Sequence, residues 1–324
     1  MSGNKLTRRR FASAVGAGAL AFHTSSFSAD APALSEAPQR KFYTVLSLGR
    51  IGFTGSFQQS VELATKYGFE GVDPDPGYFS QLTDDQLKGL LGDLKAKNLR
   101  LGAAGLPVDF RKDEQTFSDG LKNLPATAKL LSRAAVSRLS TYVVPYSDDL
   151  TYLQNFRQHA CRLGACARVL RDYGQRLGLE YVAQRTLWRS ERHPFIHTLS
   201  EMKELMVAIG TENLGVQLDN YHWYSAEETE EDLLALRNQD VVTVDLSDAP
   251  VGMSMDTLIG TSRELPAATG VIPVSFLDAL LKIGYNGPVA AEPFNAALRA
   301  MPIAQACAAT AAAMKKAFSL AGIA

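Results

Sequence analysis

Four acidic residues fall at or near the ends of four apolar segments in the second half of the chain. Glu180 lies inside LGLEYV, Asp219 ends LGVQLD, Asp245 lies in VVTVDLSD, and Glu292 ends PVAAE. Charged side chains are rarely buried unless they are paired or bind a metal. Four neighbouring carboxylates would repel one another, and a divalent cation would remove that repulsion. The pattern therefore predicts a metal site suited to Mn²⁺ or Mg²⁺, with Co²⁺ or Zn²⁺ as further candidates.

His222 follows Asp219 by three residues, in the segment DNYH. Its imidazole offers a nitrogen ligand or an acid/base group. A lone histidine in a loop is more often structural, but its place beside an acid that ends a strand favours a role in the site. His193 and His197, in RSERHPFIHT, lack such a neighbour. Solvated side chains at the entry to a helix explain these two equally well.

The elements that must position these residues alternate along the chain from residue 40 onward. Short β-branched runs predict strands at 42–48, 71–73, 100–104, 138–144, 179–182, 214–218, 241–246 and 289–291. Longer helical patterns predict helices at 57–67, 83–97, 115–132, 150–177, 199–209, 226–237, 274–283 and 303–320. Eight strand–helix units in one series predict a single-domain α/β protein with the (β/α)8 TIM barrel fold.

Two connections in this pattern are long, at 183–198 and 247–273. Both follow strands, and in a barrel such connections lie on the face where the strands end, where they usually cover or line a site. A doubly wound sheet is the alternative fold, but it usually has fewer units. The segment LGRIG after the first strand also lacks the spacing of a dinucleotide-binding fingerprint.

The N-terminus carries a basic segment, TRRRF at residues 7–11, followed by a short apolar run of small residues. This pattern resembles a twin-arginine export signal, and the run is too short to span a membrane. We therefore expect residues 1–35 to be an export signal and leader, residues 36–324 to form the barrel, and the protein to be periplasmic. Nothing later in the chain predicts a membrane span.

The composition excludes some function classes. The formal net charge of −1 becomes more acidic without residues 1–33, which hold four basic groups and one acid. A nucleic-acid partner is therefore not expected, since such proteins carry a basic surplus. The three cysteines include no CxxC pair. The segment HAC at 159–161 looks faintly like a ligand pair, but the packed face of a long helix is the simpler interpretation.

Five motifs together resemble the sugar phosphate isomerase/epimerase group of xylose-isomerase-like barrels. In chain order they are LGLEYV, LDNYHWY, VDLSDAP, SRELPAATG and YNGPVAAEPF. The resemblance covers nearly all of the chain after the leader. It implies a divalent metal bound by Glu180, Asp219 and Glu292, with His222 at the metal or substrate and Arg263 at substrate oxygens.

One position departs from the family pattern. Asp245 stands where many relatives have a histidine, and carboxylate can ligate in its place. Asp248, in the same segment, matches another acid of the pattern. Metal ligation is therefore expected from Glu180, Asp219, Asp245 and Glu292. Which of Asp245 and Asp248 faces the ion stays open, with Asp248 otherwise at the substrate.

The resemblance implies proton transfer next to a carbonyl group. Glu180 and Glu292 would remove and return the proton through an enediolate, as in an isomerase or epimerase of a sugar or related polyhydroxy carbonyl compound. Arg263 would hold a substrate hydroxyl or the developing oxyanion. Aromatic side chains that could line the pocket or simply pack in the core are Trp188, Tyr221, Trp223 and Phe294.

Three other functions compete with this interpretation. A metal-dependent lyase or dehydratase acting on sugar derivatives, such as 3-keto-glycosides, would abstract the same proton and then eliminate a neighbouring oxygen. A non-catalytic exported sugar-binding barrel would use the same ligands without turnover. A DNA-repair endonuclease of the related barrel group would need many histidines, and only His159, His193, His197 and His222 follow the leader. A small-molecule sugar is thus the expected partner, and a homo-oligomer is possible.

Overall fold

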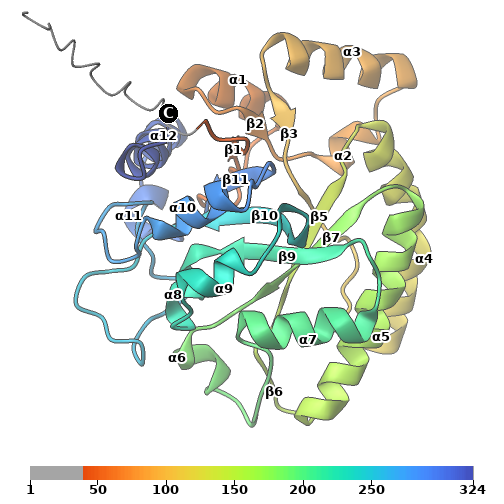
Figure 1. Cartoon of the computed structure of the whole chain (residues 1–324). Helices are drawn as coiled ribbons and strands as arrows, with labels where there is room; N and C mark the ends of the chain where they lie inside the picture. Colours follow the sequence, from red (N-terminus) through yellow and green to blue (C-terminus); the bar gives the residue numbers. More distant parts are fainter. Residues whose placement is uncertain (1–38, 324) are drawn as a thin grey trace, which may run out of the picture. The chain divides into compact units, whose positions relative to one another are not determined.

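The computed structural model describes residues 39–323 of the chain (Figure 1). The predicted export signal and leader, with their boundary at residue 35, lie outside the described residues. None of the described helices combines the length and apolar character that a membrane crossing requires.

Within residues 39–323, nine parallel strands form the main sheet in the order β3-β2-β1-β11-β10-β9-β7-β5-β4. The strands are β1 (Tyr43–Leu46), β2 (Gly71–Val72), β3 (Arg100–Leu101), β4 (Ala104–Gly105), β5 (Arg138–Val143), β7 (Arg176–Tyr181), β9 (Leu214–Asp219), β10 (Val241–Leu246) and β11 (Pro288–Ala291). The two end strands, β3 and β4, are separated only by Gly102 and Ala103, so the ends of the sheet meet. The predicted (β/α)8 barrel is confirmed, with its third strand divided in two.

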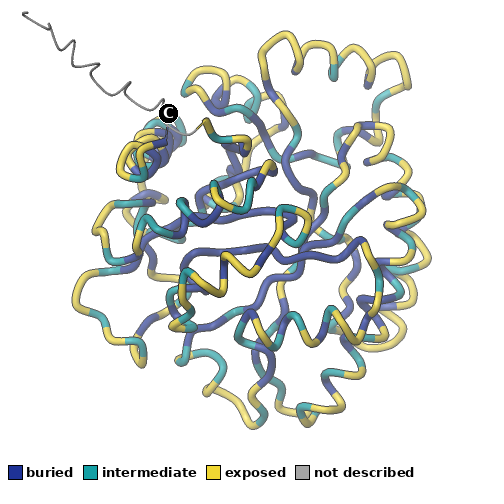
Figure 2. Tube along the Cα trace, in the orientation of Figure 1, coloured by how far each residue is buried: buried dark blue, intermediate teal, exposed yellow. Residues whose placement is uncertain are grey.

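Helices surround this sheet, and its strands are largely buried (Figures 1 and 2). One longer helix or helical segment follows each of the eight strand units: α1 (Phe57–Tyr67), α3 (Asp84–Ala96), α4 (Glu114–Arg133), α5 (Tyr152–Asp172), α7 (Leu199–Ile209), α9 (Glu230–Leu234), α10 (Ser275–Lys282) and α12 (Ile303–Leu320). Shorter elements lie in the connections: α2 (Pro76–Phe79), β6 (Tyr146–Ser147), α6 (Arg185–Trp188), β8 (His193–Pro194), α8 (Asn220–Ser225), η1 (Asn238–Asp240) and α11 (Ala296–Arg299).

Besides the divided third strand, the structure differs from the prediction at the helix expected at 226–237 and where the helix expected at 150–177 meets the fifth strand. The helix expected at 226–237 is replaced by α8 and the shorter α9. The first begins early because the Asp219 side chain accepts a hydrogen bond from the Tyr221 N–H, which caps it. The helical conformation is interrupted between them, where Glu227 takes a φ of 58°. The fifth strand starts earlier than expected, at Arg176, because Gly174 with a φ of 70° ends the preceding helix.

Apolar side chains fill the barrel interior near the amino ends of the strands. Polar side chains lie near the carboxyl ends. Val242 packs so closely against Gly178 and Gly215 that a Cβ at either glycine would lie 2.9 or 2.8 Å from the valine side chain. Both glycines are therefore needed for this inner packing. The acidic residues of β7, β9 and β10 come further along the same strands, at the face where the strands end.

The two long connections contact each other on that face, as their positions after strands led us to expect. Arg185 and Arg189, in and next to α6, place Nη1 atoms 3.1 and 2.9 Å from Asp256 Oδ1. Thr186 Oγ1 also donates a hydrogen bond of 2.6 Å to the Leu258 carbonyl oxygen. The segment after β7 therefore holds the loop after β10 in place.

A partly buried carboxyl group, that of Glu228, connects α7 to the barrel. Its side chain accepts hydrogen bonds from the Tyr181 hydroxyl at 2.5 Å and from the Leu199 N–H at 2.6 Å. Burial raises the pKa of Glu228 from 4.5 to about 7, although these two hydrogen bonds oppose the rise. A carboxyl with a raised pKa in the folded state contributes stability that is fully present below pH 4.5 and is lost as the pH rises through 7.

We therefore expect Glu228→Gln to match the wild type near pH 4 and to be more stable by about 1–3 kcal/mol at pH 8. Denaturant unfolding across this range measures the difference. A stability difference that stays constant with pH would show that Glu228 does not titrate in this window.

Candidate metal centre

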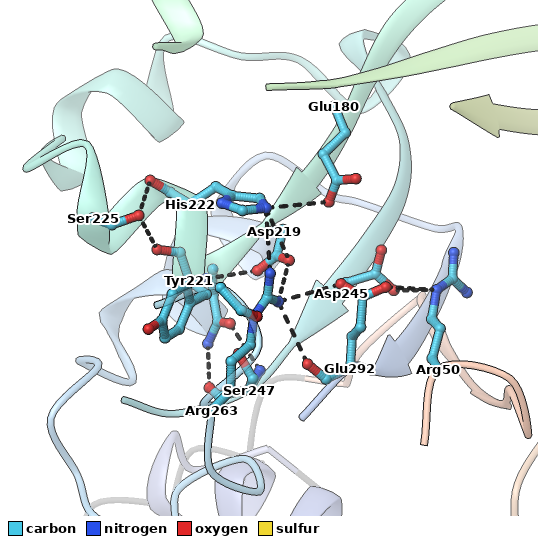
Figure 3. A network of polar contacts seen from close by, with 12 residues as sticks. Arg50, Glu180, Asp219, Tyr221, His222, Ser225, Asp245, Ser247, Arg263 and Glu292 are labelled. Atoms are coloured by element: carbon cyan, nitrogen blue, oxygen red, sulfur yellow. Dashed lines mark hydrogen bonds and ion pairs between the residues drawn. The ribbon is translucent and has the colours of Figure 1, made fainter. Parts of the chain in front are cut away.

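Four successive parts of the sheet carry one acid each to the same end of the barrel. Glu180 lies near the end of β7, Asp219 ends β9, Asp245 lies in β10, and Glu292 directly follows β11. The register pairs Asp219 with Asp245, and the Glu292 N–H donates to the Leu246 carbonyl oxygen at 2.9 Å. The four predicted acids thus lie at one level and point toward a common region (Figure 3).

Three ligand groups lie closest together in this region. Glu180, Asp219 and His222 each offer one ligand atom, and these atoms all lie within 4.8 Å of one another. His222 Nε2 is 3.8 Å from Glu180 Oε1 and 3.7 Å from Asp219 Oδ2. Because Asp219 caps α8, the same acid that ends the strand also fixes the helix that presents His222.

Two arginines enter the acidic cluster. Arg263 Nη1 lies 2.6 Å from Asp219 Oδ2 and 3.2 Å from Glu292 Oε2. Arg50, from the connection after β1, places Nε 3.2 Å from Asp245 Oδ1 and 3.6 Å from Glu292 Oε1. Four carboxyl groups therefore face two guanidinium groups, so the cluster keeps a surplus of acidic groups.

Burial, together with this surplus, raises the pKa of three of the acids. Burial, followed by repulsion from Glu292 and Asp219, raises the pKa of Glu180 well above its usual value. Burial and the neighbouring Asp245 raise the pKa of Glu292 to about 8, with Arg263 opposing. Burial also raises the pKa of Asp245 to about 6, against the attraction of Arg50. These carboxyl groups would ionise more readily beside an added cation.

Asp219 and His222 behave differently. Burial alone would raise the pKa of Asp219, but Arg263 and the Tyr221 N–H stabilise its carboxylate enough to lower the pKa below the ordinary value. Burial lowers the pKa of His222 to about 3, so its imidazole is neutral at physiological pH. A carboxylate beside a neutral imidazole is the state in which both groups bind metals.

The group of Glu180, Asp219 and His222 fits a divalent cation. Glu180 Oε1 is buried and has no hydrogen-bond partner among residues 39–323. Such an orphaned acceptor is costly unless something satisfies it. Carboxylate oxygens with one imidazole suit Mn²⁺, Co²⁺ or Zn²⁺, and Mg²⁺ more weakly. Ligation by Asp245 and Glu292, which face arginines here, stays a prediction.

A cavity of about 440 Å³ opens over this cluster. Its wall includes the polar groups of Glu180, His222, Arg263 and Glu292, and its other lining residues are Tyr142, Val144, Pro145, Tyr146, Val182, Gln184, Leu187, Gly260, Thr261 and Phe294. The volume lies within the range of small-molecule sites, and a largely apolar wall with a few convergent polar groups is typical of them.

Several predicted residues are not brought into this cavity. Both carboxylate oxygens of Asp248 accept backbone N–H bonds, including those from Gly270 at 2.7 Å and Ile272 at 2.9 Å, so this acid holds the loop after β10. Trp188 stacks on His197 with ring centroids 4.4 Å apart, and neither lines the cavity. The adjacent Leu187 does.

The other aromatic candidates divide between core and site. Trp223 is buried against Phe276, and Tyr221 lies beneath the Arg263 guanidinium, 4.6 Å from its ring centroid. Phe294 lines the cavity, as predicted for a pocket residue. Arg263 Cζ also lies 5.0 Å from the Phe294 ring centroid, so two aromatic rings hold this arginine.

Sequence reasoning missed two residues of the site. Arg50 is the first, because its partners Asp245 and Glu292 lie far from it in the sequence. Gln184 is the second: its Nε2 lies 2.9 Å from His222 Nδ1, and the Ala183 N–H donates to the same nitrogen at 3.3 Å. These contacts fix the orientation of the imidazole ring.

Comparisons with known proteins identify the family and agree with the fold. A family model described as xylose isomerase-like TIM barrel matches residues 61–317. An inosose isomerase from Halalkalibacterium halodurans is 24% identical over 252 residues, which cover 73% of this chain and 82% of the relative. A 3-dehydroshikimate dehydratase from Pseudomonas aeruginosa is 29% identical over 131 residues, covering 40% of this chain and 19% of the relative. A solved xylose isomerase domain protein from Alicyclobacillus acidocaldarius has a TM-score of 0.76 and 28% identity, covering 86% of this chain and 99% of that one.

Proposed function

The chain belongs to the xylose isomerase-like TIM barrel family, and on this premise we propose that it is a divalent-metal-dependent isomerase or epimerase. Its substrate would be a sugar or a related polyhydroxy carbonyl compound. The N-terminal TRRRF segment supports a periplasmic location as part of the same proposal.

One observation carries the proposal: a buried Glu180–Asp219–His222 group faces a cavity that also contains Glu292 and Arg263. The inosose isomerase likeness supports the same class of reaction, since an inosose carries a carbonyl group beside hydroxyl groups.

The proposed chemistry assigns each residue one task. Glu180, Asp219 and His222 would hold the ion, which supplies Lewis-acid stabilisation of the developing enediolate. Glu292 and Glu180 would remove the proton next to the carbonyl and return it, because both carboxyl groups lie in the cavity wall. Arg263, fixed by two aromatic rings, would donate a hydrogen bond to a substrate oxygen.

A lyase or dehydratase is the second candidate, and the likeness to 3-dehydroshikimate dehydratase favours it. It would use the same proton abstraction and then expel a neighbouring oxygen. Product analysis of ketoses, aldoses and 3-keto-glycosides incubated with the metal-supplemented protein separates the two reactions. An isomeric sugar supports the proposal, and an enone with loss of a water or an alcohol supports elimination.

Metal addition gives a direct test. We expect chelator-treated protein to gain about 2.7 kcal/mol of stability when Mn²⁺ or another divalent ion is present at a hundred times its Kd. Thermal unfolding with and without the ion measures the gain. His222→Ala should lose most of this gain in stability. Asp240→Asn, which changes a residue directly before the amino end of β10, should keep the gain. Failure of Mn²⁺, Co²⁺, Zn²⁺ and Mg²⁺ alike to stabilise the protein would contradict the proposed metal centre.

A further inference from the structure

A second cavity adjoins the first one near the amino end of α5. It has a volume of about 220 Å³ and shares Val144 and Tyr146 with the cavity over the metal centre. We call it the annex pocket. The lining residues used below are Arg111, Asp149, Leu150, Asn155 and His159.

The wall between the two cavities is held in place by backbone pairing. Strand β6 pairs antiparallel with β8, with Tyr146 opposite Pro194. The Phe195 N–H donates to the Pro145 carbonyl oxygen at 2.7 Å, which extends this pairing. The two cavities are therefore neighbouring compartments of one preformed surface.

His159 offers a free hydrogen-bond acceptor at the annex pocket. Its side chain is held between the rings of Phe110 and Phe195, with centroids 5.4 and 4.9 Å away, and the residue is only 5% exposed. Nδ1 lies 2.9 Å from the Asn155 carbonyl oxygen and so donates to it, while Nε2 has no partner among residues 39–323. Burial lowers the pKa of His159 to about 4, so Nε2 keeps its lone pair at neutral pH.

Arg111 offers a free donor at the same pocket. Its guanidinium is fixed by a 3.0 Å hydrogen bond from Nη2 to Thr141 Oγ1 and by stacking 4.1 Å from the Tyr142 ring centroid. Its Nε is buried and has no partner within the described part of the chain. Tyr142 itself lines the first cavity, so this arginine stands at the border of the two compartments.

These groups match a hydroxylated ligand. A histidine that only fills a core normally has both nitrogens satisfied, yet here an acceptor and a donor are left without partners beside one cavity. Hydroxyl groups can satisfy both, because each one donates and accepts. Asp149 opposes the charge of Arg111 in the lining, which favours a neutral ligand over an anion.

We propose that the annex pocket binds a second hydroxylated ring joined to the reacting sugar, so that the substrate is a glycoside or another two-ring polyhydroxy compound. A ligand hydroxyl donates to His159 Nε2, and another accepts from Arg111 Nε. This inference rests on the proposed function, because it places the reacting ring in the cavity over the metal centre.

Calorimetric titration of the Mn²⁺-supplemented protein tests the inference with two probes, D-fructose and isomaltulose, a glucosyl-fructose. Isomaltulose should bind more tightly than D-fructose. His159→Phe keeps the ring between Phe110 and Phe195 but removes the acceptor. This variant should weaken the binding of isomaltulose about threefold to tenfold and leave the binding of D-fructose unchanged. Leu150→Trp, which fills only the annex pocket, should weaken isomaltulose binding selectively without depending on His159.

His197→Phe is the matched control, since His197 lines neither cavity. Its affinities for both probes should equal those of the wild type. Equal affinity of the wild type for both probes, or unchanged isomaltulose binding in both annex variants, overturns the annex pocket while leaving the proposed function intact. Failure of both probes to bind overturns both, and the separate Mn²⁺ titration then shows whether the metal centre itself survives.

Discussion

Turnover should fall by about 10²- to 10⁴-fold when Glu292 is replaced by glutamine. Glu292 lies in the cavity wall, and burial with repulsion from Asp245 raises its pKa to about 8. A carboxyl group with that pKa can hold or release a proton near neutral pH. Glutamine has nearly the same shape and can still accept a hydrogen bond from Arg263, but it cannot carry the proton. The loss should therefore appear in kcat of the Mn²⁺-supplemented enzyme.

Glu180→Gln should reduce turnover at least as much and should also weaken metal binding. Its carboxylate belongs to the buried group with Asp219 and His222, whereas Glu292 lies outside that group. Parallel titrations with Mn²⁺ separate the two effects. Glu228→Gln is the control, because Glu228 is a partly buried carboxyl group outside the cavity, and this variant should keep full activity. Full activity in either the Glu180 or the Glu292 variant would exclude the proton-transfer scheme.

Much of the fold was readable from local pattern. Short β-branched runs and amphipathic helices each carry their own signal, and eight such units identify a barrel. The placement of the acids was readable for the same reason, because a charged residue that ends an apolar strand must lie at the carboxyl face. The division of the third strand into β3 and β4 was not readable, since it depends on pairing with two different neighbours.

The role of Arg50 could not be predicted from the sequence. Its partners, Asp245 and Glu292, belong to the last strands of the barrel, and only closure of the sheet between β1 and β11 brings them near the first connection. No local pattern reports such a contact. The sequence therefore revealed the acids and their repulsion but only one of the two arginines that relieve it.

Asp248 and Trp188, expected at the substrate and in the pocket wall, do not line the cavity. Asp248 follows Asp245 by three residues, but β10 ends at Leu246 and the chain turns away. Its carboxylate then satisfies backbone N–H groups of the loop, a need that the sequence does not display. Trp188 ends the short helix α6, whose direction leaves Leu187 facing the cavity instead. Both errors arise where a strand pattern gives way to loop geometry.

Arg263→Met should destabilise the metal-free protein by about 3–5 kcal/mol. The Arg263 guanidinium is 3% exposed and joins Asp219 to Glu292, so its removal leaves buried carboxyl groups without their counter-charge. Arg237→Met is the matched control. Arg237 forms an ion pair with Asp240, but its side chain is 70% exposed, so its loss should leave the stability almost unchanged. Denaturant unfolding in the presence of chelator measures both.

A divalent cation should restore much of the stability that Arg263→Met loses. Arg263 Nη1 and the proposed ion both draw on Asp219 Oδ2, so the arginine competes with the ion for the same oxygen. Removing the arginine should thus raise Mn²⁺ affinity even as it destabilises the metal-free protein, and a purely structural arginine would not produce this opposite pair of effects. Turnover should stay low in the rescued variant, because the cation replaces the charge of Arg263 but not its hydrogen bond to the substrate. Weaker Mn²⁺ binding by Arg263→Met would mean that the arginine organises the metal ligands rather than competing with the ion.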